Sequence, residues 1–217
     1  MSETMKKRVL LIGDSIKFFY REEVEKNLGA DYEVFAPSEN CRFSTYGLNS
    51  LRFWLQEFPD ADIIHWNFGL WDTAILYKED GCFTSIEMYV ATMKKILREL
   101  QKTGAFIIFA TTTPVHEDKK NLEGPIPPAH RNEDIIRYNS AILKEFEKED
   151  IYINDLHSLM YAEKEKYLLS DMIHPNPDGI KVLGRAVADS VLSVKEIEVN
   201  RERREIQKLV INEKTVQ

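Results

Sequence analysis

Residues 9–15 read VLLIGDS, four apolar residues that end abruptly in glycine, aspartate and serine. A short apolar run that stops at turn residues is typical of a strand buried on both faces of a sheet. Four later segments have similar length and character. The predicted strands therefore span residues 8–12, 32–36, 62–66, 105–110 and 151–153.

Segments with helical periodicity lie between these runs, and they predict helices at residues 19–28, 48–58, 86–102, 133–148 and 178–194. This alternation predicts an α/β fold with a doubly wound parallel sheet. Right-handed crossovers bring the carboxyl ends of all parallel strands to one edge, where ligands bind in such folds. The loops expected at that edge are residues 13–16, 37–47, 67–72 and 111–131.

The chain has 217 residues, of which 43% are hydrophobic and 30% charged, a composition that suits one soluble domain with a sizeable core. We assign residues 1–194 to that domain. Residues 195–217 mix both charge signs densely and are predicted to be a charged tail or an extra helix. Their weak apolar edge leaves open the alternative that they mediate homo-oligomerisation.

Charge and hydropathy argue against several classes of partner. The formal net charge of -7 argues against a nucleic-acid-binding protein, which would usually present a basic face. No apolar stretch approaches the length of a membrane span, and the run at residues 9–12 is too short for a signal peptide. The only two cysteines, Cys41 and Cys82, form no C-x-x-C motif. We therefore expect a cytoplasmic protein without a membrane or nucleic-acid partner.

Ser15 admits three interpretations on local grounds. A serine between a strand and a helix is most often a helix cap. A phosphate-binding loop fits less well, because GDS holds one glycine and lacks the lysine of that motif. A nucleophile would need a histidine base, an acid that orients it, and donors for an oxyanion.

His174 supplies the first of these partners. It lies in SDMIHPNPDG, three residues after Asp171, so a carboxylate can reach the ring N–H within one turn of chain. Alone, Asp171 would be read as a turn cap. A metal site built from Asp171, His174 and His157 lacks a further convincing ligand at fixed spacing, and no metal is predicted.

Taken together, GDS near the start and D-x-x-H near the end of a five-stranded α/β chain resemble the SGNH hydrolases, the GDSL-type esterases and lipases. The resemblance runs from about residue 8 to residue 192. It implies a flavodoxin-like three-layer α/β/α sandwich with a five-stranded parallel sheet. It also implies that Ser15 is the nucleophile, Asp171 the acid and His174 the base.

The resemblance further implies an oxyanion hole made of the Ser15 N–H, a glycine N–H and an asparagine side chain. Gly47 is the glycine of the matching loop, and it is expected just before a helix, where its N–H would be free. The usual G-x-N-D block reads Gly69-Leu70-Trp71-Asp72 here, so Asn67 is the better candidate for the side-chain donor. WNFGLWD is similar to a variant found in carbohydrate-esterase-like branches. Trp71 and Asp14 are assigned to the substrate pocket.

Two softer predictions concern the segment after the fourth strand. Residues 116–139 form a long, polar, proline-bearing stretch typical of a lid or substrate loop. Within it, Arg131, Asn132 and Asn139 either bind substrate or serve as ordinary surface and capping residues.

The function implied is serine ester hydrolysis on a small soluble ester, with an O-acetylated carbohydrate as the suggested substrate and no cofactor. Trp66 or Trp71 could stack on a sugar ring, although Trp66 reads equally well as core. The alternatives are an inactive SGNH-like binding module and an acyltransferase.

Overall fold

The computed structural model describes residues 6–77, 79–116 and 129–194. The predicted tail at 195–217 and half of the predicted lid, residues 117–128, lie outside the described residues. In the part that is described, no helix has the length and apolar character needed to cross a membrane.

A five-stranded sheet forms the centre of the molecule, and every pair of neighbouring strands is parallel. Its strand order is β2-β1-β3-β4-β5, the flavodoxin-like order, which confirms the predicted fold class. The strands are β1 (Lys7–Ile12), β2 (Tyr32–Phe35), β3 (Ile63–Trp66), β4 (Phe106–Ala110) and β5 (Tyr152–Asn154).

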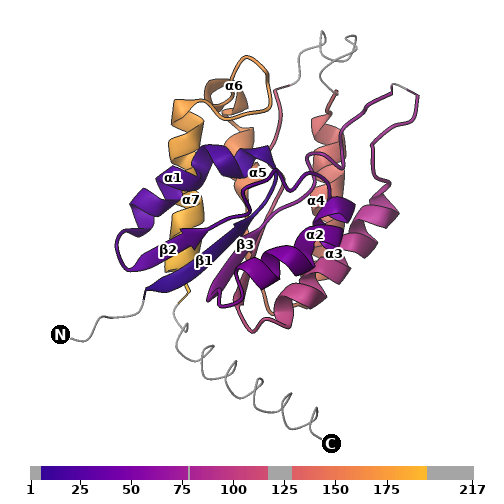
Figure 1. Ribbon diagram of the computed structural model, residues 1–217. Helices are drawn as coiled ribbons and strands as arrows, with labels where there is room; N and C mark the ends of the chain where they lie inside the picture. Colours follow the sequence, from indigo (N-terminus) through magenta and orange to yellow (C-terminus); the bar gives the residue numbers. More distant parts are fainter. Residues whose placement is uncertain (1–5, 78, 117–128, 195–217) are drawn as a thin grey trace, which may run out of the picture.

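Helices cover both faces of this sheet, as Figure 1 shows. One layer holds α1 and α7 with the shorter α5 and α6, and the other holds α2, α3 and α4. The bounds are α1 (Ser15–Leu28), α2 (Ser44–Glu57), α3 (Ile86–Gln101), α4 (Asn132–Phe146), α5 (Leu156–Tyr161), α6 (Lys164–Tyr167) and α7 (Pro177–Leu192).

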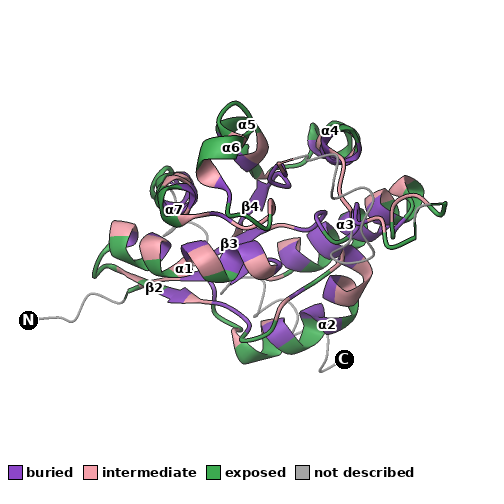
Figure 2. Cartoon of the chain, turned by 90° about the horizontal axis from the view of Figure 1, so that it is seen from above, coloured by how far each residue is buried: buried purple, intermediate pink, exposed green. Residues whose placement is uncertain are grey.

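Strand β1 shows how its apolar sequence fits between the two helical layers. Val9 and Leu11 pack into the core beneath α1 and α7, while Leu10 and Ile12 pack into the core beneath α2 and α3. All four are at most 1% exposed, and the centre of the sheet is buried from both sides (Figure 2). A strand with two covered faces has no polar side to alternate with, hence the continuous apolar run.

Helices α1 and α7 lie side by side, and their close approach brings two distant parts of the sequence together. At Gly184 on α7, an added Cβ would stand 2.6 Å from Cβ of Glu23 on α1. Only glycine permits that separation. Helix α1 begins at Ser15 and α7 begins three residues after His174, so this packing aligns the two ends of the motif.

Helix starts differ most from the predictions. Helix α1 begins at Ser15 and not at residue 19, and α2 begins at Ser44, four residues before the expected start. The short helices α5 and α6 were not predicted, because six and four residues are too few for a periodic pattern to register.

Candidate active site

The candidate site lies where β1 and β3 end. In this strand order the chain leaves the sheet in opposite directions after these two strands, which opens a crevice beyond their carboxyl ends. Ser15 follows β1, and Asn67 follows β3. Backbone bonds join the surrounding loops, including Cys41 N to Gly13 O at 3.3 Å and Asn67 N to Ile12 O at 3.0 Å.

A chain of two hydrogen bonds links Ser15 to a distant pair of residues. Its Oγ lies 2.8 Å from Nε2 of His174, and Nδ1 of His174 lies 2.7 Å from Oδ2 of Asp171. With Asp171 ionised, Nδ1 carries the proton and Nε2 is free to accept one from the serine. The structure therefore brings together the three residues that the motifs single out, across 159 positions of sequence.

Asp171 is oriented by the backbone as well as by the imidazole. Its Oδ1 accepts bonds from the N–H groups of Ile173 and His174, at 3.0 and 2.9 Å. Partial burial acts to raise the pKa of this carboxyl, but those two bonds and the His174 ring outweigh it and hold the pKa below its usual value. Asp171 therefore stays ionised where it faces the imidazole.

The turn that carries Asp171 and His174 is fixed at several points. Met172 adopts a left-handed conformation with φ of 68°, and its carbonyl accepts a bond from His116 N. Leu169 N donates to His174 O at 2.7 Å. A non-glycine residue with positive φ persists only where the surroundings enforce it, so this turn is held in one shape.

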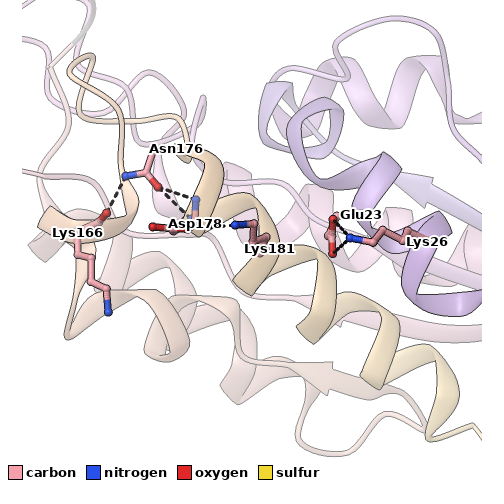
Figure 3. Close-up of polar contacts among 7 residues, drawn as sticks. Glu23, Lys26, Lys166, Asn176, Asp178 and Lys181 are labelled. Atoms are coloured by element: carbon pink, nitrogen blue, oxygen red, sulfur yellow. Dashed lines mark hydrogen bonds and ion pairs between the residues drawn. The ribbon is translucent and has the colours of Figure 1, made fainter.

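Asn176, two residues after His174, joins α6 to the start of α7, as Figure 3 shows. Its Oδ1 caps the helix by accepting from the N–H groups of Asp178 and Gly179, and its Nδ2 donates to Lys166 O at 2.7 Å. The proline at position 177 occupies the first helical position, where its missing N–H has no consequence. These contacts fix the start of α7, three residues after His174.

An aromatic ring supports the imidazole from the other side. Phe19, one turn after Ser15 on α1, stacks on the His174 ring with centroids 4.8 Å apart and planes inclined by 27°. The imidazole is thus held between a hydrogen-bonded carboxylate and an aromatic face. Its ring plane has little freedom to turn away from Ser15.

Asp14, which was predicted to line the substrate pocket, is buried at the start of α1. It is the N-cap of α1, where Oδ1 accepts from Ile16 N at 2.9 Å, and it is only 2% exposed. Burial raises the pKa of its carboxyl to about 6, against the lowering effects of the Ile16 bond and the charges of His174 and Lys17. Among the residues that the structure describes, none forms a hydrogen bond with Oδ2. Asp14 is therefore a buried neighbour of the site that lines a small hollow together with Asn67, and its predicted contact with substrate stays a prediction.

Gly47 does not have the predicted oxyanion geometry. It lies inside the first turn of α2, and its N–H donates to Phe43 O at 3.0 Å, so it is not a free donor. A Cβ at this position would stand 2.2 Å from Cζ of Phe68. The glycine is explained by this close packing against the buried Phe68 ring.

The early start of α2 has a specific cause in Asp72. This buried carboxylate accepts bonds from Ser44 N, at 2.9 Å to Oδ2, and from Ser44 Oγ, at 2.6 Å to Oδ1. Burial raises the pKa of Asp72, and the bonds from Ser44 oppose that shift. The aspartate of the G-x-x-D block thus caps a helix that begins 28 residues earlier in the chain.

Asn67 keeps its place at the crevice. One N–H of its amide donates to Ala110 O at 2.7 Å, which fixes the side chain between β3 and β4. A primary amide carries two donors, so the geometry leaves the second available. With the Ser15 N–H, which has no intrahelical partner at the first position of α1, Asn67 is the candidate that the structure retains.

Trp71 is 40% exposed on the loop that follows β3, so it is available to a ligand, and its predicted role in the pocket stays a prediction. Trp66 and His65 are fully buried, as expected for core residues. Burial lowers the pKa of His65 to about 3, which leaves this ring neutral.

Two asparagines predicted either to bind substrate or to cap have a different role. The side chain of Asn132 bonds both N and O of Val115, and the side chain of Asn139 bonds both N and O of Thr112. They are seven residues apart, two turns of α4, and together they hold the segment after β4 in an extended form. Arg131 pairs with Asp134 at 2.7 Å.

A cavity of about 420 Å³ lies outside this site, between α4 and α5, and is lined among others by Ile136, Leu143 and Tyr161. It contains none of Ser15, His174 and Asp171. The candidate chemistry is therefore placed at the β1–β3 crevice and not in the larger hollow.

Sequence reasoning missed four residues that shape the site, two of which had a local signal. Phe19 and Asn176 lie next to recognised motifs, and the helical spacing of four from Ser15 and the N-P-D-G string could have pointed to them. Asp72 and Lys17 act through partners that are distant in the sequence. Only the three-dimensional arrangement reveals them.

Comparisons with known proteins bear on the fold of this chain. No protein-family model and no curated protein matches the sequence. Among solved structures, a carbohydrate acetylesterase family member from Sinorhizobium meliloti has a TM-score of 0.69 at 17% identity, with 85% of this chain and 97% of that chain covered.

Two further solved structures are similar over most of their length. An acetylxylan esterase from Geobacillus stearothermophilus has a TM-score of 0.65 at 16% identity, covering 88% of this chain and 96% of that one. A GDSL-like lipase from Bacteroides thetaiotaomicron has a TM-score of 0.64 at 14% identity, covering 86% and 88%. At these identities the likeness establishes the fold, which this chain shares with these two esterases and the GDSL-like lipase.

Proposed function

We propose that this protein is a serine ester hydrolase of the SGNH type. The observation that carries the proposal is the chain of hydrogen bonds from Ser15 Oγ through His174 to Asp171, at 2.8 and 2.7 Å. A serine that only capped a helix would need neither a base at its Oγ nor an acid behind that base.

The reaction follows from the position of each group. His174 Nε2 removes the Ser15 proton as Oγ attacks the ester carbonyl, and Asp171 stabilises the imidazolium that forms. The Ser15 N–H and the second N–H of Asn67 hold the negative oxygen. The imidazolium then gives its proton to the leaving alcohol, and water, activated by the same histidine, releases the acid from the acyl-enzyme.

The proposed substrate is a small soluble ester, with an O-acetylated carbohydrate as the specific suggestion. The acetylesterases among the similar folds support this class, and the partly exposed Trp71 offers a ring on which a sugar could stack. Esters of one alcohol with acetyl, butyryl and octanoyl groups test it. We expect kcat/KM to fall as the acyl chain lengthens, and a preference for octanoyl would contradict the acetate assignment.

Asn67→Ala tests the oxyanion assignment. Loss of one donor to a developing oxyanion typically lowers turnover about a hundredfold, so we expect that loss in kcat with a smaller change in KM. The measurement is steady-state hydrolysis of an acetyl ester, with thermal unfolding to check that the bond to Ala110 is not needed for folding. Wild-type kcat in a folded Asn67→Ala variant would remove Asn67 from the mechanism.

A further inference from the structure

Lys17 is a fully buried cation two residues after Ser15. It is 1% exposed, although lysine is among the residues least often buried. Its Nζ donates to Pro37 O at 2.9 Å and to Glu39 O at 3.1 Å, and lies 3.7 Å from Cys41 Sγ. Burying an ammonium group is costly unless hydrogen bonds compensate it, and here backbone carbonyls of one loop supply them.

The loop that Lys17 binds is the one beside the candidate nucleophile. It joins β2 to α2, and its Cys41 N donates to Gly13 O, in the turn that presents Ser15. Lys17 and this bond hold the loop on the side of α1. Glu39 holds the same loop on the side of α2, because its carboxylate accepts from Trp54 Nε1 at 2.9 Å and from the Tyr46 hydroxyl.

The backbone of this loop is strained at one residue. Arg42 adopts a left-handed conformation with φ of 54°, and its N–H donates to Asn40 Oδ1 at 2.9 Å. A non-glycine residue in this region is retained only where neighbouring contacts enforce it. Lys17 bonds the carbonyls of Pro37 and Glu39, earlier in the same loop, so it is placed to maintain the shape of this loop.

We propose that Lys17 is a positioning residue, which fastens the β2–α2 loop to the first turn of α1 and so fixes the wall of the crevice against Ser15. Its ammonium group touches no substrate. The proposal rests on the proposed hydrolase function only for its effect on catalysis. The fastening itself can be measured on the inactive protein.

The test uses Cys41 as a reporter of the loop. In a Cys82→Ser background Cys41 is the single thiol, and its burial protects it from an aromatic disulfide reagent. Lys17→Met keeps the apolar stem and removes the donors, and Lys17→Gln keeps an amide donor. Loss of the ammonium group also raises the pKa of the Cys41 thiol, so the labelling rate is compared per thiolate, from its dependence on pH. On that basis we expect Lys17→Met to speed the labelling of Cys41 by about tenfold or more, because the loop opens more often.

Catalysis gives the second reading. We expect Lys17→Met to lower kcat for an acetyl ester about 10- to 100-fold while KM changes less than about threefold. The reason is that a small displacement of the β2–α2 loop beside Ser15 disturbs the alignment of the reacting groups in the transition state more than it disturbs substrate binding. Lys17→Gln should fall between wild type and Lys17→Met in both measurements. A general loss of stability would not produce that split between kcat and KM in folded protein.

Lys26→Met is the matched control. Lys26 lies on the same helix, and its side chain is 75% exposed and pairs with Glu23 at the surface (Figure 3). It should leave both the labelling rate and kcat unchanged. Wild-type labelling and wild-type kcat in folded Lys17→Met would overturn the proposal.

Should neither Lys17 variant fold, nuclear magnetic resonance of the wild-type protein decides. A Lys17 ammonium held by two carbonyls should exchange its protons slowly and show couplings to the Pro37 and Glu39 carbonyl carbons, whereas fast exchange like that of Lys26 would overturn the fastening. If the wild type hydrolyses no ester, the proposed function fails, while labelling and exchange still decide the role of Lys17.

Discussion

Two helices of this protein begin with a serine beside a buried aspartate, and the two starts have opposite consequences. At α1, Ser15 follows its own N-cap Asp14, and the serine hydroxyl faces His174. At α2, Ser44 is bound through both its N–H and its hydroxyl to Asp72, 28 residues away. The first aspartate leaves its serine hydroxyl free to bond the histidine, and the second occupies the hydroxyl of its serine.

This contrast separates what local sequence determines from what the fold determines. The cap of α1 is adjacent in sequence, so the position of Ser15 beyond β1 could be predicted. The cap of α2 comes from another loop, and it starts the helix one turn early. These long-range bonds from Ser44 to Asp72 place Gly47 inside the helix, where its N–H donates to Phe43 O and is not free for an oxyanion.

Substitution of the two serines should give the largest difference between the two helix starts, one in activity and the other in stability. Ser15→Ala removes the proposed nucleophile, and we expect hydrolysis of an acetyl ester to fall at least about a thousandfold, with little change in thermal unfolding. Ser44→Ala removes a buried bond to a carboxylate, so it should lower the free energy of unfolding by about 1–3 kcal/mol and leave kcat within about threefold of wild type.

The outcome that would contradict this contrast is the reverse pattern. If Ser44→Ala abolished turnover in folded protein, or if Ser15→Ala destabilised the fold and kept its activity, the roles of the two serines would have to be exchanged.

Asp14→Asn tests the aspartate at the start of α1 through the pH dependence of stability. The Asp14 carboxyl has a pKa of about 6 in the folded protein, against a reference value of 3.8. A raised pKa means that its stabilising contribution is complete below about pH 4 and is lost as pH rises through about 6. The shift corresponds to roughly 3 kcal/mol. The asparagine variant, which has no such titration, should therefore gain stability relative to wild type over this window.

Urea unfolding of both proteins between pH 4 and 7.5 measures that difference, in which the titrations of His65 and His130 cancel. A constant difference across the range would mean that Asp14 has an ordinary pKa and that its burial does not favour the protonated form.

Gly47→Ala tests directly whether this glycine is needed for packing or as an oxyanion donor, and we expect an effect on stability alone. An added Cβ would collide with the Phe68 ring, and overpacking of this kind typically costs about 1–3 kcal/mol. Thermal unfolding should detect the loss, and Phe68→Leu in the same chain should restore part of it. An oxyanion donor would behave differently: Gly47→Ala would then keep its stability and lose turnover, which would reinstate the original assignment.

The fold was accessible from the sequence for a physical reason. Residues 9–12 and 63–66 lie in strands covered on both faces, and such strands are almost wholly apolar, which makes them recognisable in the sequence. Ser15, Asp171 and His174 were also accessible, because each lies within three residues of a distinctive string. Because Ser15 directly follows a predicted strand, its place at the carboxyl edge of the sheet could be predicted as well.

The remaining features depend on contacts between distant segments. Asp72, Lys17 and Asn139 each bond backbone that is 20 or more residues away, and no local pattern reports such a bond. The burial of Asp14 could not be predicted from the sequence for a related reason. Its neighbour Ser15 belongs to the crevice, but the capping geometry turns the carboxylate into the core.

The central claim is that His174 activates Ser15. The most direct measurement is mass spectrometry of the full-length protein after reaction with a fluorophosphonate probe, followed by identification of the modified peptide. We predict one adduct per chain, on Ser15, with labelling lost in Ser15→Ala, strongly slowed in His174→Ala and unchanged in Ser44→Ala. An unlabelled wild-type protein, or an adduct that persists in Ser15→Ala, would contradict the claim.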